Sequence, residues 1–126
     1  MTQPRGHPEA DLQRAIVHAL RIVLPFGAEV HASNNEVRGS SDWARKQQAL
    51  NRSMGQRPGF PDLMIMVDRR VLFLEVKTPE GRLSTAQREF QAFALTQGHG
   101  FAVVRSVDDA LAALREYNIK TRIAHG

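Results

Sequence analysis

The sequence predicts a mixed α/β domain in which helices flank one sheet, with the element order α-β-(α)-β-β-α-β-α. Segments with apolar residues at helical spacing alternate with short apolar runs of strand character. Two of these runs, 62–67 and 71–76, are separated by so few polar residues that they predict a hairpin. The 126 residues suit a single domain, 1–126, that buries its own core without disulfides or a structural metal.

The first half of the chain contains one well-marked helix and one weaker segment. Residues 8–24 have helical apolar spacing, with a proline in the first turn and a proline and a glycine just beyond the end. Residues 28–32 form a short candidate strand. Residues 41–54 form a candidate helix with Ser41 as its cap and a thin apolar face, which explains the parentheses in the element order.

The second half is better marked by its caps and turns. Residues 84–97 predict a helix that ends at Gly98, where a glycine commonly follows a helix. Residues 101–105 predict a strand, and 106–117 predict the last helix, which begins with a capping-box-like pair. We expect the tail, 118–126, to be loose.

Composition restricts the possible functions only broadly. The chain has no cysteine, so thiol chemistry and cysteine-type zinc sites are excluded. No apolar run approaches the ~18 residues of a membrane span, and we expect a soluble, cytoplasmic protein of a bacterial or phage-infected cell. The net charge of +4 is compatible with nucleic-acid binding but does not establish it.

Charged residues at the ends of the hairpin strands are the strongest functional signal. Glu75 and Lys77 are two residues apart at the end of an apolar strand, so they share one face of the sheet. With Arg69 and Arg70 as the two loop residues, Asp62 lies opposite Lys77 and diagonal to Glu75, and the three groups converge. A loop longer by one residue would move Asp62 to the other face.

Two carboxylates without a nearby histidine or cysteine form a hard oxygen site that suits Mg²⁺ or Mn²⁺. A lysine beside such a metal can orient or deprotonate an attacking water, or stabilise charge on a phosphorane. A lone Glu-x-Lys is usually a surface ion pair, and a lone Pro-Asp is usually a turn. The two patterns joined through an apolar hairpin favour a site for phosphodiester hydrolysis.

The segments "GFPDL", "FLEVKTPEGRLSTAQ" and "GHGFAVVRS" resemble the VRR-NUC branch of the PD-(D/E)XK nucleases. The resemblance implies a PD-(D/E)XK core with Mg²⁺ or Mn²⁺ as cofactor. It implies that Asp62, Glu75 and the backbone carbonyl of Val76 are metal ligands and that Lys77 is the catalytic lysine. By the same resemblance, Gln87 and Glu9 complete the catalytic site.

Some of these assignments have simpler alternatives. Ser84 and Gln87 also form a capping box, so Gln87 can serve its helix alone, and the two roles can coexist. Glu9 lies in a first helical turn, where any acid favours the helix dipole. His31, Asn35 and Glu36 lie where the family often has a histidine and an asparagine before an acidic residue. An additional asparagine in this sequence makes their alignment with those positions ambiguous.

The resemblance implies a metal-dependent endonuclease, and stand-alone members of the branch point to branched DNA such as Holliday junctions. Flap, nicking or restriction-like cleavage remain alternatives, as does a non-catalytic DNA-binding module of the same fold. The absence of a glycine-rich phosphate loop argues against a nucleotide cofactor. A junction has two equivalent scissile phosphates, so we expect a homodimer. The candidate DNA-binding residues, which otherwise form a solvated face, are Arg38, Arg45, Lys46, Arg52, Arg57 and Arg82.

Overall fold

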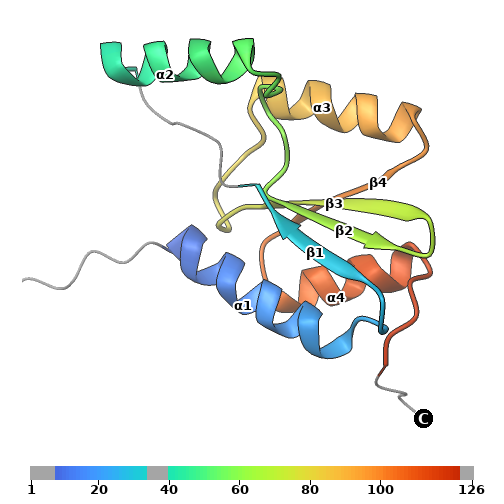
Figure 1. Cartoon of the computed structure of the whole chain (residues 1–126). Helices are drawn as coiled ribbons and strands as arrows, with labels where there is room; N and C mark the ends of the chain where they lie inside the picture. The colour runs from blue at the N-terminus through green and yellow to red at the C-terminus, as the bar shows by residue number, and fades with distance from the viewer. Residues whose placement is uncertain (1–7, 34–39, 123–126) are drawn as a thin grey trace, which may run out of the picture.

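The computed structural model describes residues 8–33 and 40–122 and confirms the predicted element order, including the uncertain helix (Figure 1). No helix in this described part of the chain has the length and apolar character needed to cross a membrane. The elements are α1 (Pro8–Val23), β1 (Glu29–Ala32), α2 (Asp42–Ser53), β2 (Leu63–Val67), β3 (Arg70–Val76), α3 (Thr85–Thr96), β4 (Gly100–Val104) and α4 (Val107–Glu116).

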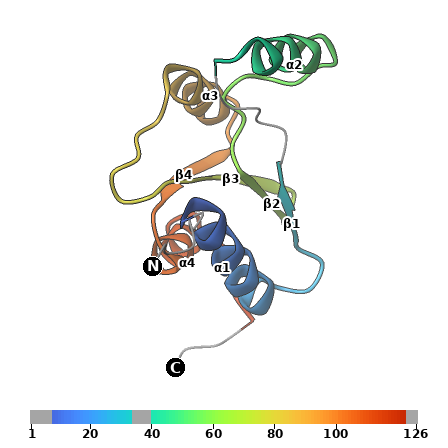
Figure 2. The same ribbon diagram turned by 90° about the vertical axis from the view of Figure 1, so that its left-hand side faces the viewer.

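The four strands form one mixed sheet in the order β1-β2-β3-β4. The β1–β2 and β2–β3 pairs are antiparallel, whereas β3 and β4 are parallel and are connected through α3. Helices α1 and α4 cover one face of the sheet, and α3 covers the other, with α2 beyond it (Figures 1 and 2). The mixed α/β sheet flanked by helices is therefore confirmed.

Successive side chains along β3 point to opposite faces of the sheet, and the core is divided into two parts accordingly. Leu72 and Leu74 belong to the larger cluster, which includes buried residues of α1 and α4. Phe73 belongs to a smaller aromatic cluster with Phe90 and Phe101 on the α3 face. Because successive strand residues point to opposite faces, Glu75 shares the α3 face with Phe73.

The hairpin turn differs by one position from the prediction. Val67 pairs with Arg70, so Asp68 and Arg69 form the turn, with φ values of 49° and 62°. Two successive left-handed residues match a type I′ turn, whose twist suits the flanking strands, and aspartate is among the residues that tolerate this conformation. The loop still has two residues, so Asp62 keeps its predicted face.

One further expectation is corrected. Residues 118–122 are not loose, because Ile119 is buried in the larger core cluster and Arg122 donates hydrogen bonds to the carbonyls of Arg21 and Ile22 at the end of α1. The remaining tail residues lie outside the described part. The predicted helix 41–54 is present as α2, and the three side chains of its predicted apolar face are exposed: Trp43, Leu50 and Met54.

Candidate active site

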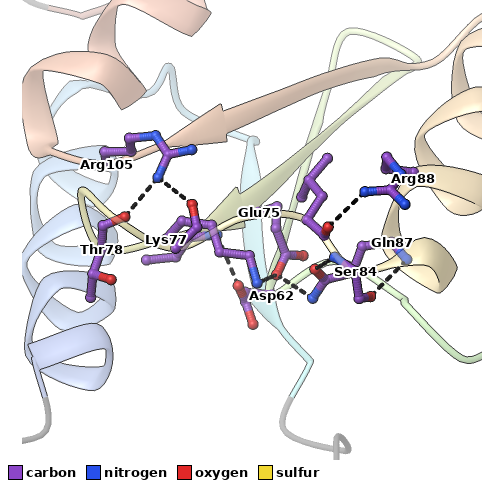
Figure 3. A network of polar contacts seen from close by, with 11 residues as sticks. Asp62, Glu75, Lys77, Thr78, Ser84, Gln87, Arg88 and Arg105 are labelled. Carbon is purple, nitrogen blue, oxygen red and sulfur yellow. Dashed lines mark hydrogen bonds and ion pairs between the residues drawn. The ribbon is translucent and has the colours of Figure 1, made fainter.

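The charged triad of the hairpin lies at one end of the sheet, where β2 begins and β3 ends (Figure 3). The pairing of Leu63 with Leu74 continues by one residue to place Asp62 opposite Glu75, rather than opposite Lys77 as predicted. The Lys77 ammonium Nζ lies 3.7 Å from Glu75 Oε1, and the two side chains are only 11% and 1% exposed. Glu75 and Lys77 thus form a buried ion pair beside Asp62.

Backbone pairing on both sides holds this end of the sheet in place. The Ser33 N–H donates to the Asp62 carbonyl at 2.8 Å, which extends the β1–β2 ladder to the site. The Lys77 N–H donates to the Val104 carbonyl at 3.0 Å, which extends the β3–β4 ladder. Asp62 and Lys77 are therefore carried by sheet backbone rather than by a free loop.

Asp62 also makes a direct contact with β3. Its Oδ2 accepts a hydrogen bond from the Val76 N–H at 2.8 Å. The strand register continues to place Pro61 opposite Val76, and a proline has no N–H to donate to the Val76 carbonyl. The N–H and C=O of one strand residue point to the same side of the strand, so this carbonyl, like the Val76 N–H, is directed to the Asp62 side of β3. The Pro-Asp pair thus gives Val76 a side-chain acceptor for its N–H and leaves its carbonyl without a ladder donor from position 61.

Gln87 connects the first turn of α3 to the carboxylate pair. Its Oε1 accepts from the Ser84 N–H at 2.8 Å, and the Ser84 Oγ accepts from the Gln87 N–H at 3.1 Å, so the capping box is present. The Gln87 Nε2 donates to Glu75 Oε1 at 3.0 Å. One amide therefore caps α3 and contacts Glu75, while a catalytic role for Gln87 stays a prediction.

Arg105 is a residue of the site region that the sequence analysis did not identify. Its Nη1 donates to the carbonyls of Thr78 and Gly81 at 2.7 Å each, and to that of Pro79 at 3.3 Å. These carbonyls belong to the loop that follows Lys77 (Figure 3). A usable signal is present in the sequence, because Arg105 is the last residue of the predicted strand 101–105 and the only charged residue in it.

The other predicted catalytic residue, Glu9, lies half-buried in the first turn of α1. Helix α1 begins at the same end of the sheet where β3 ends (Figures 1 and 2). Among residues 8–33 and 40–122, no three acidic, histidine or cysteine side chains group together in a way that could hold a metal ion. Glu9 is thus near this end of the molecule but does not form a three-acid cluster with Asp62 and Glu75.

The donor set fits a divalent oxygen-binding metal. Two carboxylates on opposed strand positions and the Val76 carbonyl provide oxygen ligands only, as Mg²⁺ and Mn²⁺ prefer. Of the residues with an ambiguous alignment, His31 lies exposed on β1, paired with Met64, and the other two, Asn35 and Glu36, are outside the described residues.

The candidate DNA-binding side chains are exposed where the structure describes them, and Arg38 lies outside the described residues. Arg45 and Lys46 lie on α2, with Arg45 paired to Asp42. Arg52 is also on α2, Arg57 is on the loop before β2, and Arg82 is on the loop before α3. Most of these cations therefore lie over the sheet face that bears Asp62 and Glu75.

Comparisons with known proteins agree with this architecture. The family model of the VRR-NUC domain matches residues 9–108, which include Glu9 and the whole region from Asp62 to Arg105. A solved structure titled "VRR_NUC domain protein" matches with a TM-score of 0.69 over 93% of each chain, at 20% sequence identity, a likeness that shows the fold. A search of curated proteins finds no match. The chain belongs to the VRR-NUC family of nuclease-type domains, whose fold is consistent with a PD-(D/E)XK core.

Proposed function

We propose that this protein is a divalent-metal-dependent endonuclease that hydrolyses phosphodiester bonds in branched DNA, with Holliday junctions as the first candidate substrate. The observation that carries the proposal is the cluster at the end of β3. Asp62 and Glu75 occupy opposed strand positions, and Lys77 lies 3.7 Å from Glu75 in a nearly buried position. A Mg²⁺ or Mn²⁺ ion held by Asp62, Glu75 and the Val76 carbonyl would supply Lewis acidity toward a phosphate oxygen.

The residues of this chain have separate tasks in the proposed reaction. The Lys77 ammonium is kept beside the site by Glu75, where it stabilises negative charge that develops on the phosphate or orients the attacking water. Gln87 restrains the Glu75 carboxylate through its amide. Glu9, at the start of α1, is the candidate for an additional acidic contribution from outside the sheet.

Exposed cations supply the proposed DNA-binding surface. Arg45, Lys46 and Arg52 on α2, with Arg57 and Arg82 on loops, form a basic set around the α3 side of the sheet. Phosphate contacts of this kind provide affinity that falls steeply with salt and does not depend on sequence. We expect alanine at Lys46 or Arg82 to weaken binding to all DNA structures alike. The slope of log affinity against log salt concentration should decrease by about one, as for the loss of one phosphate contact.

The proposed partner is a second copy of the chain. One chain offers one Asp62–Glu75–Lys77 cluster, whereas a four-way junction has two scissile phosphates related by a two-fold axis. A symmetric dimer presents two such clusters with matched polarity. Light scattering should give about twice the 14.1 kDa chain mass. A chain that stays monomeric on junction DNA would instead support flap or nicking cleavage.

The direct test is a cleavage panel of four-way junction, flap, nicked and linear duplexes with Mg²⁺, Mn²⁺ or EDTA. Asp62→Asn, Glu75→Gln and Lys77→Ala should each reduce cleavage by about 10²-fold or more while DNA binding persists. Asp68→Asn removes an exposed carboxylate from the turn of the same hairpin and is the matched control, which should cut normally.

Robust cleavage by the Lys77→Ala protein would refute the assigned site. If the wild-type chain binds branched DNA tightly but cuts none of the substrates with either metal, the protein is instead a non-catalytic DNA-binding module of this fold. A cytoplasmic location in a bacterial or phage-infected cell is the setting that we propose for either activity.

A further inference from the structure

A large cavity lies between α2, α3 and the sheet, and the function proposed above uses none of its lining residues except Arg52 and Arg57. Its volume is about 710 Å³, within the range of ligand-binding cavities in proteins. We call it the aromatic cavity because its lining includes Phe60, Phe73, Phe90 and Phe93.

The aromatic cavity and the candidate active site are neighbours on the same face of the sheet. Met64 and Phe73 are paired on β2 and β3 and line the cavity. Asp62 and Glu75 are the next pair on the same face, one two-residue step away, or roughly 7 Å along the strands. The separation between the site and the cavity is thus about the distance between neighbouring residues on one face of a strand.

One wall of the cavity packs against a helical turn that also contacts the candidate active site. Gly59 lines the cavity and has a φ of 77°, and a side chain at this position would approach the Ala86 carbonyl to 2.4 Å and the Gln87 nitrogen to 2.7 Å. The loop before β2 therefore lies directly against the first turn of α3. The same turn carries Gln87, which contacts Glu75.

The chemistry of the lining suits an aromatic, anionic ligand. The Arg57 guanidinium carbon lies 4.3 Å from the ring centre of Phe93 and 5.2 Å from that of Phe90, which forms a stacked cationic surface. Arg52 adds a second permanent cation, and Asn51 and Gln56 add side-chain amides. None of the described residues that line the cavity is acidic. Aromatic rings, guanidinium planes and amides are the groups that stack on nucleobases and bind their edges.

We propose that the aromatic cavity receives one unpaired nucleobase from the DNA strand that is cut, next to the scissile phosphate. This inference rests on the proposed nuclease function. It also provides a physical reason for structure selectivity, because a base at a branch point, flap or nick leaves its stack at a lower free-energy cost than one within a duplex. The Arg57–Phe93 stack is the surface on which the base lies.

Photocrosslinking tests where the base is placed. 5-Iododeoxyuridine is introduced at successive positions around the branch of a forked DNA, and the complex is irradiated with Lys77→Ala protein so that the DNA stays intact. We expect one or two adjacent positions to crosslink to the peptide that contains Phe93. Phe93→Leu keeps an apolar side chain but removes the ring, so it should lose this crosslink. Leu95→Ala, an exposed position of α3 outside the cavity, is the matched control and should retain it.

Affinity measurements on a single-stranded oligonucleotide provide an independent test, since no base pair must be broken. An abasic site at the crosslinking position should weaken binding by the wild type and by Leu95→Ala about 5- to 150-fold. The same abasic site should change binding by Phe93→Leu little, because the ring that stacks on the base is already absent.

Crosslinks confined to other surfaces, or an abasic penalty that is equal in Phe93→Leu and wild type, would overturn the cavity proposal. The wild-type cleavage panel separates this failure from failure of the proposed function. Cleavage without a crosslink in the cavity rejects only the cavity. Crosslinking without cleavage in either metal rejects the nuclease and the placement of the base beside a scissile phosphate, and leaves only base binding in the cavity. A chain that binds no DNA in anisotropy measurements rejects both.

Discussion

Gln87 uses both ends of its side-chain amide, and its two contacts serve different purposes. Its oxygen accepts from the Ser84 N–H at the start of α3, and its nitrogen donates to the Glu75 carboxylate. A single buried residue therefore stabilises a helix terminus and restrains a candidate metal ligand. The two contributions can be separated, because Ser84 takes part only in the first.

Alanine substitutions at Ser84 and Gln87 should separate the effect of the helix cap on stability from the effect of the Glu75 contact on catalysis. Ser84→Ala removes the hydroxyl acceptor of the capping box and should lower the free energy of unfolding by about 0.5–2 kcal/mol, with kcat unchanged. Gln87→Ala should cause a similar loss in urea denaturation and also lower kcat, because Glu75 loses an amide donor. Equal kcat values for the two variants would show that Gln87 acts only as a cap.

At the scale of elements, the loop between β3 and α3 is held at both ends. Arg105, directly after β4, donates to three carbonyls in the first half of this loop. Arg88 on α3 donates to the Leu83 carbonyl at the other end. Lys77 directly precedes this loop, so we expect Arg105 to act as a positioning residue for the lysine.

Arg105→Ala should release the loop without removing any charged group from the site. We expect kcat to decrease several-fold with a smaller effect on KM, and proteolysis within 78–83 to become faster. Arg105→Lys should not restore kcat, because an ammonium cannot reproduce the planar donor geometry of a guanidinium. Arg115→Ala, which removes an exposed arginine of α4, is the control for net charge. A kcat for Arg105→Ala equal to that control would remove the positioning role.

At the scale of the whole molecule, residues 118–122 connect α4 to α1. Ile119 packs in the larger core cluster, and the Arg122 guanidinium lies 4.5 Å from the Phe26 ring centre while donating to carbonyls at the end of α1. The end of the described chain therefore connects the two helices that cover the sheet face opposite Asp62 and Glu75.

Ile119→Ala should lower the free energy of unfolding by about 2–5 kcal/mol, because it removes buried methyl groups and leaves a cavity. The neighbouring Lys120→Ala, at an exposed position, should change it by less than about 0.5 kcal/mol. Urea denaturation with a common slope gives both values. A loss for Ile119→Ala no larger than that for Lys120→Ala would show that this segment does not stabilise the fold.

The sequence by itself determined the element order and the face on which Asp62 and Glu75 meet. Both follow from local rules: apolar periodicity defines each element, and a two-residue hairpin loop preserves the parity of side-chain direction. These rules did not determine which two residues form the turn. That choice depends on backbone conformations at Asp68 and Arg69 that suit the twist of the paired strands.

Only the tertiary structure decided the contacts between segments that are far apart in the chain. Arg105 reaches the loop after Lys77 across 27 residues, and its three carbonyl acceptors carry no side-chain signature in the sequence. The sequence predicted a thin apolar face for α2 but not its partner, and Trp43 and Met54 are exposed because α2 lies beyond α3 rather than on the sheet. The aromatic cavity likewise exists only because α2 and α3 are placed around the sheet. Periodicity shows that a helix has an apolar face, but the packing of other elements decides what that face contacts.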